Sequence, residues 1–331
     1  MKILFVFTGG TIGSTLQAGN VISPDAQKSY KIIEAYGAKH PIDFEYDVLE
    51  PYTELSENNT GENLKKLAAC VLGSLNSGYD GIVVTHGTDT LQYTAAALGY
   101  AAGSDCIPIC IVSANRPIEH AQSNALDNLH AAICTIRASI GRGVFVPYRN
   151  DNSTTVMLHR ATRLLAGKAF SDEVSSIFDS VFGHFDTDFN FIRNESYRER
   201  ADETAPLDLS ALGKSSEKIM LIPAYTGMPY PEINEKVKYI LLNTYHSGTV
   251  NTKSETAREF FSKARQMGVA VFATGITDGP EYASASEYGE LGIIGLRNIS
   301  PVAAYIKLWI LSEMSGDVCD IINKSLAGDI V

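Results

Sequence analysis

The sequence predicts an α/β protein with a larger N-terminal parallel-sheet domain and a smaller C-terminal α/β domain. Short apolar runs rich in β-branched residues recur along the chain, and helix-like stretches lie between many of them. Strands that alternate with helices build sheets that are covered on both faces. The chain has 331 residues, of which 45% are hydrophobic, so it can bury at least one large core and has the usual length of two domains.

The expected strands are short apolar runs, and their length and β-branched content favour strand over helix. They are Ile3–Phe7, Gly81–Thr85, Ile107–Ser113, Gly143–Pro147, Lys218–Ile222, Tyr239–Asn243 and Val269–Ala273. Helices are expected between them, because apolar residues there recur every three or four positions. They are Asn63–Leu75, Ala121–Thr135 and Thr256–Met267, and Trp309 is expected in the core of a C-terminal helix.

The composition changes near residue 194. Residues 195–216 are polar and charged, include Pro206 and Gly213, and contain few large apolar side chains. Such a stretch indicates a linker between domains. We therefore expect a catalytic α/β domain over residues 1–194, a linker over 195–216 and a smaller α/β domain over 217–331.

The composition also excludes several classes of function. A net charge of -11 repels polyphosphate, so no nucleic-acid partner is expected. The five cysteines are irregularly spaced, and neither they nor the histidines have the spacing of a metal site, so buried reduced thiols and no metal are expected. No apolar run approaches the ~18 residues of a membrane span, and no signal peptide is recognisable. We expect a cytoplasmic protein without a membrane contact.

A first candidate motif, Thr8–Ser14, directly follows the first expected strand. Ligands of open α/β sheets bind just beyond the carboxyl ends of strands, and glycines there let a ligand approach the backbone. Thr11 lies between glycines, where a nucleophilic hydroxyl would be accessible. The motif lacks the G-x-x-x-x-G-K-[ST] and G-x-G-x-x-G patterns, so nucleotide binding is not favoured. A tight turn without function is the alternative.

A second candidate motif, Val83–Leu91, again follows a strand and opens a helix. Thr88 and Asp89 would lie near the helix N-terminus, where such residues are good caps, and capping alone is one interpretation. The other is that Thr88 offers a hydroxyl and a backbone N–H, while Asp89 holds a substrate amine or orients a base. The absence of G-x-S-x-G argues against a serine hydrolase of the α/β-hydrolase kind.

Together the two motifs contain the groups that amide hydrolysis needs. A hydroxyl becomes a good nucleophile only when a nearby base removes its proton. Donors are also needed for the oxyanion that forms on the attacked carbonyl. Two threonines, an acid and glycine-flanked N–H groups provide such a set if the two strands are neighbours.

These motifs resemble a known family. T-G-G-T-I-G at residues 8–13 followed by H-G-T-D-T-L at residues 86–91 is similar to the paired signatures of bacterial-type L-asparaginases, closer to the cytoplasmic type. The segments 52–58 and 113–117 resemble further parts of the family pattern. The resemblance implies a flavodoxin-like N-terminal domain, hydrolysis of L-asparagine with L-glutamine as a second candidate substrate, no cofactor, and a homodimer or homotetramer with sites at subunit contacts.

The resemblance also assigns roles to residues at matching positions. The catalytic group consists of the nucleophile and the residues that activate it, namely Thr11, Thr88, Asp89 and Lys168. The substrate-binding group consists of Ser56 for the α-carboxylate, Glu57 for the α-amino group, Gly87, and the backbone carbonyl of Ala114. His86 is expected to pack structurally, and Arg163 would be a poor proton acceptor because a guanidinium stays charged.

Two departures from the family pattern keep other functions open. The loop 16–22 lacks the tyrosine that the family usually carries there, with Tyr30 further on, and Gly248–Thr249 stands in place of a glycine–asparagine pair. One alternative is therefore an amino-acid-binding protein with impaired catalysis. Another is the ammonia-generating subunit of a tRNA-dependent amidotransferase, which normally carries an extra N-terminal domain, whereas this chain starts at the first catalytic strand.

Overall fold

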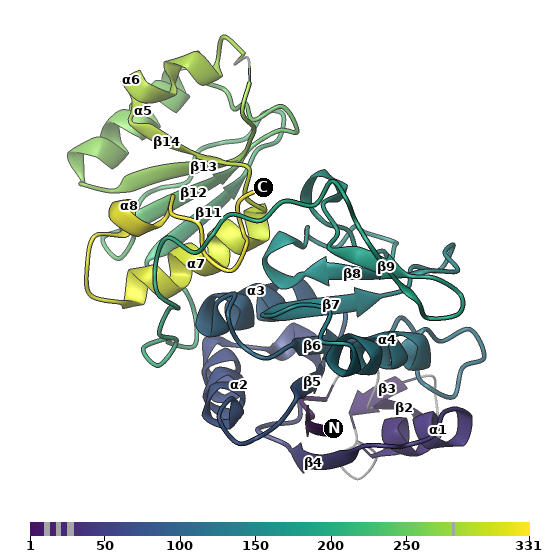
Figure 1. Ribbon diagram of the computed structural model, residues 1–331. Coiled ribbons are helices and arrows are strands. Elements are labelled where there is room, and N and C mark those ends of the chain that lie inside the picture. Colours follow the sequence, from purple (N-terminus) through teal and green to yellow (C-terminus); the bar gives the residue numbers. More distant parts are fainter. Residues whose placement is uncertain (10–13, 18–20, 25–29, 280–281) are drawn as a thin grey trace.

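The computed structural model describes residues 1–9, 14–17, 21–24, 30–279 and 282–331 (Figure 1). In these ranges eight strands form one large sheet in the order β10-β9-β8-β7-β6-β5-β1-β4. Their bounds are β1 Lys2–Val6, β4 Glu45–Leu49, β5 Gly81–Thr85, β6 Ile109–Val112, β7 Val144–Tyr148, β8 Val156–Arg160, β9 Gly183–Phe185 and β10 Phe191–Arg193. A separate antiparallel pair consists of β2 Ser14–Gln17 and β3 Val21–Pro24.

The larger part of this sheet is parallel. Strands β4, β1, β5, β6 and β7 run in the same direction. In chain order they have the arrangement 2-1-3-4-5 of flavodoxin-like folds, which confirms the predicted fold class. The rest of the sheet differs from the predicted parallel arrangement, because β8, β9 and β10 pair in antiparallel fashion. These strands were not predicted, because β9 and β10 have only three residues each and β8 ends in His159–Arg160.

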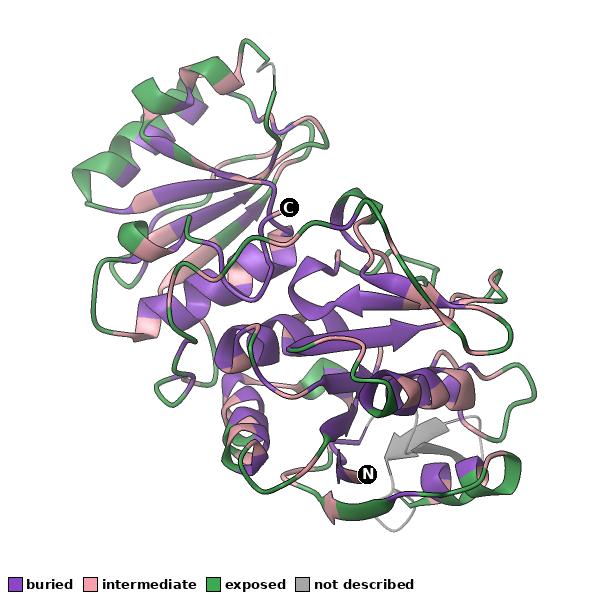
Figure 2. Ribbon diagram, in the orientation of Figure 1, coloured by how far each residue is buried: buried purple, intermediate pink, exposed green. Residues whose placement is uncertain are grey.

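Helices cover both faces of the large sheet (Figure 1). Helices α2 (Gly61–Ser74) and α3 (Leu91–Ala102) pack in one core with Leu4 and Val6 of β1. Helices α1 (Lys31–Lys39) and α4 (Ala125–Arg137) pack in a second core with Ile3 and Phe5. Alternate side chains of a strand point to opposite faces, so the apolar run of β1 fills both cores. Figure 2 shows the central strands buried and the outer helix faces exposed.

A second sheet follows in the sequence. It is parallel throughout, in the order β11-β12-β13-β14, with bounds Ile219–Pro223, Tyr239–Asn243, Ala270–Ile276 and Ile293–Arg297. Helices α5 (Glu255–Gln266) and α6 (Tyr288–Leu291) share its outer core. The sequence predicted β11, β12 and β13 within a few residues but not β14, whose run contains a glycine and ends in arginine.

Helix α7 (Pro301–Glu313) joins the two sheets. It packs against α3, and the core that it shares with α3 also contains Phe272 of β13. Trp309 is 7% exposed, which confirms its predicted place in the core of this helix. The large sheet ends at Arg193 and the small sheet begins at Ile219. The division into residues 1–194, 195–216 and 217–331 remains a prediction, because α7 buries side chains against both regions.

A short helix, α8 (Val318–Ile321), precedes the C-terminal segment. Within the described ranges no helix combines the length and hydropathy that crossing a lipid bilayer requires. All five cysteines are free; Cys106 and Cys110 are buried as predicted, whereas Cys319 is exposed because it lies on the surface of α8.

A buried ion pair and its hydrogen bonds attach the C-terminal segment to helices α7 and α3. The Nζ of Lys307 on α7 lies 2.8 Å from Oδ2 of Asp329, and neither side chain is exposed. The hydroxyl of Tyr100 on α3 donates to the same Oδ2 at 3.0 Å, and Oδ1 accepts from the backbone N–H of Leu326 at 3.0 Å. Arg163 adds a bond to the carbonyl of Gly328 at 2.7 Å. The two buried charges are tolerated here because hydrogen bonds from the protein take the place of hydration.

We predict that Lys307→Met lowers the free energy of unfolding by about 3–5 kcal/mol, because it leaves the carboxylate of Asp329 buried and unpaired. Urea unfolding at pH 7 measures this change. The matched control is Lys236→Met, which removes an exposed ion pair with Glu217 and should change the free energy by less than about 1 kcal/mol. Equal effects of the two variants would contradict the assignment.

Candidate active site

The two signature motifs leave the large sheet side by side. Strands β1 and β5 are parallel neighbours, with Val6 opposite Val84. The segment after β1 begins the first signature, and the segment after β5 is the second. A direct bond joins them, because the hydroxyl of Thr8 donates to the carbonyl of Thr85 at 2.6 Å. The described start of the first signature is therefore held against the strand that leads into the second.

A glycine allows a third segment to approach. Gly9 has φ +95° and bridges to Glu54, whose backbone N–H donates to the carbonyl of Thr8 at 3.0 Å. A Cβ at position 9 would lie 2.4 Å from the carbonyl oxygen of Glu54, so only glycine fits here. This contact places the segment 52–58 beside the first signature. Thr11, the predicted nucleophile, lies outside the described residues.

The same segment also contacts the second signature. Ser56 is buried in a 3-10 turn, Ser56–Asn58, and its carbonyl accepts a hydrogen bond from the hydroxyl of Thr90 at 2.8 Å. Glu57 is exposed beside it. The two residues predicted to hold the substrate α-carboxylate and α-amino group are therefore attached to both signatures, although they come from a different part of the chain.

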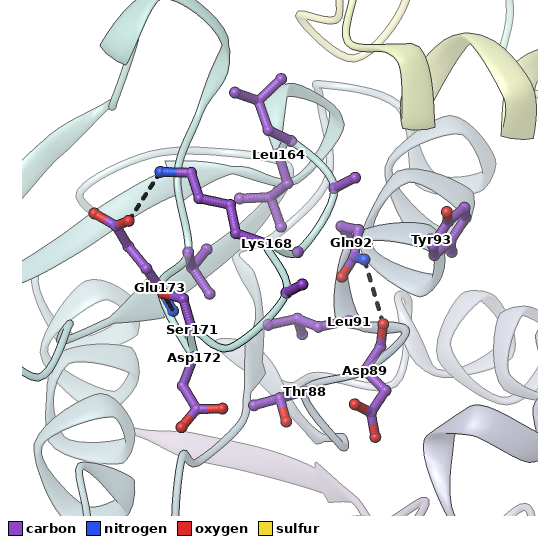
Figure 3. Close-up of a pocket in the computed structure, with 15 residues that line it drawn as sticks. Thr88, Asp89, Leu91, Gln92, Tyr93, Leu164, Lys168, Ser171, Asp172 and Glu173 are labelled. Atoms are coloured by element: carbon purple, nitrogen blue, oxygen red, sulfur yellow. Dashed lines mark hydrogen bonds and ion pairs between the residues drawn. The ribbon is translucent and has the colours of Figure 1, made fainter. Parts of the chain in front are cut away.

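Thr88 and Asp89 are available to a ligand. Helix α3 begins at Leu91 with Thr90 at the N-cap, so capping does not account for Thr88 or Asp89. Thr88 is half-buried and Asp89 is exposed, and both line a cavity of about 470 Å³ (Figure 3). No described residue forms a hydrogen bond with the side-chain oxygens of either residue. These oxygens can therefore bond a substrate without breaking an existing contact.

Lys168 lies in the same cavity but is bonded elsewhere. Its ammonium is 2.9 Å from the carboxylate of Glu173, and its side chain is 61% exposed. Figure 3 shows the ammonium directed toward Glu173 and away from Thr88. Lys168 therefore lines the same cavity as Thr88 and Asp89, and its role in catalysis remains a prediction. Glu173 was missed, because an acidic residue in a polar stretch carries no signal of its partner.

His86 is a buried neutral imidazole. Its Nδ1 lies 2.7 Å from the carbonyl oxygen of Gly87, and its Nε2 lies 3.0 Å from Nδ2 of Asn59. A carbonyl requires a donor and an amide NH₂ requires an acceptor, so the proton is assigned to Nδ1. Burial lowers the pKa of His86 to about 4. This geometry supports structural packing and adds Asn59, which the sequence did not indicate.

The other candidates have distinct surroundings. Gly87 and Ala114 are buried just beyond β5 and β6, at the same edge of the sheet as Thr88. Tyr30 is 46% exposed, and its ring centroid lies 6.0 Å from that of Phe7 at the end of β1, which places a phenol near the first signature. Tyr282 is 62% exposed in the loop between β13 and α6.

Arg163 is not a site residue. It is fully buried and bonds the carbonyls of Gly328 and Arg198 at 2.7 and 2.6 Å. The guanidinium therefore orders the C-terminal segment rather than the cavity. In the described ranges, no group of three or more His, Cys, Asp or Glu side chains is placed to hold a metal ion.

Comparison with known proteins identifies the family. The family model described as "Asparaginase, N-terminal" matches residues 2–182. The chain belongs to the asparaginase family. Two similar proteins are each named as one of the subunits of a glutamyl-tRNA(Gln) amidotransferase. The one from Pyrobaculum aerophilum is 30% identical over 94% of this chain and 75% of its own length. The one from Pyrococcus abyssi is 26% identical over 99% of this chain and 76% of its own.

Solved structures of asparaginases share the fold. The thermostable L-asparaginase from Thermococcus kodakarensis has a TM-score of 0.78 and 21% identity, and covers 100% of this chain and 99% of its own. L-asparaginase I from Vibrio cholerae has a TM-score of 0.75 and 20% identity over 100% and 99% of the two chains. At this identity the likeness shows the two-sheet architecture.

We predict that His86 makes the stability of this protein sensitive to acid. Between pH 6.5 and 4 the unfolded chain binds a proton that folded His86, with its pKa lowered to about 4, does not bind. The free energy of unfolding therefore falls as the pH falls through this window, by about 1.4 kcal/mol per pH unit for one group.

Urea unfolding at a series of pH values tests this slope, with His86→Gln as the comparison. The slope should be smaller in the variant by the contribution of one proton. Buried His159 and half-buried His130, whose pKa values are also lowered to about 4, remain in both proteins. Identical slopes for the two proteins would show that His86 does not contribute.

Proposed function

We propose that this protein is an amidohydrolase that converts L-asparagine into L-aspartate and ammonia. The observation that carries the proposal is the position of Thr88 and Asp89. Both residues line a cavity that also holds Lys168, and they follow β5, the neighbour of the strand after which Thr8 and Gly9 begin the first signature. Membership in the asparaginase family supports the same chemistry.

The proposed reaction uses the two signatures in turn. Thr11 attacks the carbon of the side-chain amide, and backbone N–H groups, including that of Thr88, stabilise the oxyanion. The C–N bond breaks and the nitrogen leaves as ammonia after it takes up a proton. Water activated beside Thr88, Asp89 and Lys168 then attacks the ester and releases aspartate. The acyl-enzyme forms on one of the two threonines, with Thr11 as our first choice.

The proposed substrate contacts are complementary in charge. Ser56 grips the α-carboxylate, Glu57 pairs with the α-ammonium, and Gly87 and Ala114 provide backbone groups at the sheet edge. A carboxylate opposite an ammonium makes a charge-assisted hydrogen bond, which favours an α-amino acid over a simple amide. L-glutamine, which has one more methylene group, is the second substrate to test.

A second candidate function is favoured by the similar proteins named as amidotransferase subunits, which match 94% and 99% of this chain. In this alternative the same amide hydrolysis supplies ammonia to a partner protein, which transfers it to a glutamyl-tRNA. The proposed assembly then differs, because an asparaginase would form a homodimer or homotetramer in the cytoplasm and an amidotransferase subunit would require another chain. Light scattering of the protein alone and ammonia release without a partner distinguish them.

We predict that the protein alone releases ammonia from L-asparagine and that Thr11→Ala and Thr88→Ala each lower kcat by about 10³-fold or more, because each removes a group that forms or breaks the acyl-enzyme. A coupled ammonia assay with L-asparagine, L-glutamine and D-asparagine measures this. Activity that is unchanged in both variants would overturn the site. No release from any amide together with measurable aspartate binding would favour an amino-acid binder.

We also predict opposite effects of the two members of the Lys168–Glu173 pair. Lys168→Met should lower kcat by about 10²-fold, as expected when a residue that assists proton transfer is lost. Glu173→Gln should raise kcat severalfold with little change in KM, because the ammonium no longer has a competing carboxylate. Lys236→Met, which breaks an exposed ion pair in the other sheet, is the control and should leave kcat unchanged. A wild-type kcat in Lys168→Met would exclude this lysine from the reaction.

A further inference from the structure

A second cavity lies between the two sheets, apart from Thr88, Asp89 and Lys168. Its volume is about 390 Å³, and residues of α2, α3, the segment 214–216 and α7 line it. Tyr93 lines both cavities. The proposed amide hydrolysis uses no residue of this second cavity.

Three buried polar atoms, in residues that line this cavity, lack hydrogen-bond partners among the described residues. They are Oδ1 of Asn59, Oγ1 of Thr94 and Nε1 of Trp309. Thr94 is 1% exposed and Trp309 is 7% exposed. An unsatisfied buried polar group costs about 1–3 kcal/mol, and native proteins keep few of them. Three such atoms in residues that line one cavity favour a ligand that supplies the missing hydrogen-bond partners.

The chemistry of the wall defines that ligand. Oδ1 of Asn59 accepts and therefore calls for an N–H donor, whereas Nε1 of Trp309 donates and calls for an acceptor. Lys214 contributes an exposed ammonium that forms no ion pair within the described part of the chain. It calls for an anion. A molecule with both an ammonium and a carboxylate fits all three groups.

The rest of the wall is apolar and aromatic. The rings of Tyr305 and Trp309 lie 6.0 Å apart, and Tyr93 meets Tyr305 edge-on at 6.1 Å. Leu64 and Ile306 complete this surface. Such a wall favours an apolar or aromatic side chain, because the contact removes apolar surface from water.

We propose that this cavity binds a free α-amino acid with an apolar or aromatic side chain. Its carboxylate lies between Lys214 and the indole N–H of Trp309, its ammonium donates to Oδ1 of Asn59 and Oγ1 of Thr94, and its side chain packs on Tyr305. The three unpartnered atoms are covered from solvent, so the proposal requires a side chain of the wall to move when the ligand binds. The half-buried rings of Tyr93 and Tyr305 are the candidates.

The second cavity is connected to the candidate active site by hydrogen bonds. Asn59 also bonds His86 through Nδ2 at 3.0 Å, and Thr90, which lines the second cavity, bonds the carbonyl of Ser56 at 2.8 Å. A ligand on Asn59 thus acts on the second signature through one side chain. The binding site stands independently of the proposed function, whereas an effect of the ligand on amide hydrolysis rests on it.

Calorimetric titration with L-phenylalanine and L-leucine tests the proposal. Binding of L-phenylalanine is expected with a Kd below about 1 mM. Phenethylamine lacks the carboxylate and phenylpropionate lacks the ammonium, so each should bind at least about 10-fold more weakly. Saturating L-aspartate should leave the titration unchanged, because it occupies the other cavity.

Three variants locate the site. Lys214→Met, Trp309→Phe and Thr94→Val should each weaken binding by about 5-fold or more, while Lys236→Met should not. Thr94→Val removes an unsatisfied hydroxyl at nearly constant volume, so it should not lower the thermal unfolding temperature, and a loss of binding in this variant is then not a loss of fold.

Two results would overturn the proposal. One is the absence of heat with both amino acids up to about 10 mM, the range of very weak binding. The other is binding that is unchanged in all three variants or abolished by L-aspartate, since the amino acid would then occupy a different cavity. Neither result bears on ammonia release from L-asparagine, which is measured separately.

Discussion

The parallel pairing of β1 with β5 is the constraint on which the candidate site depends. Chain order in the sheet reverses at this pair, so the segment after β1 leads to α1 on one face and the segment after β5 leads to α3 on the other. In sheets with this arrangement such segments diverge and leave a crevice, which is where their ligands bind. The bond from Thr8 to the carbonyl of Thr85 fixes the crevice at its base.

Much of the fold could be predicted from local sequence, because buried parallel strands are continuous apolar runs. The strands Gly81–Thr85 and Tyr239–Asn243 were predicted with the bounds that the structure has. Strands β8–β10 escaped prediction because tertiary contacts, rather than local composition, make their short and partly charged segments extended. The burial of Arg160 against Glu199, with an N–O distance of 2.6 Å, is such a contact.

The candidate site, like the fold, could be predicted only where local sequence determines it. The positions of Thr88 and Asp89 follow from strand ends and motif spacing, which a sequence displays directly. The partners of individual side chains do not, because they depend on residues that are distant in sequence or have unremarkable neighbours. Glu173 beside Lys168 and Asn59 beside His86 are such partners. They determine which groups are free to react, so local sequence indicated where the candidate residues lie but not which hydrogen bonds they form.

The bond between Tyr100 and Asp329 spans 229 residues and has a consequence for how the protein is made. A ribosome adds about 5–20 residues per second, so Tyr100 waits on the order of 10–50 s before its acceptor exists. During that time the apolar face of α3 lacks the cover that α7 provides. The nascent chain therefore exposes part of its largest core until α7 has been translated, and folding of the N-terminal sheet is completed only after the C-terminal sheet has been translated.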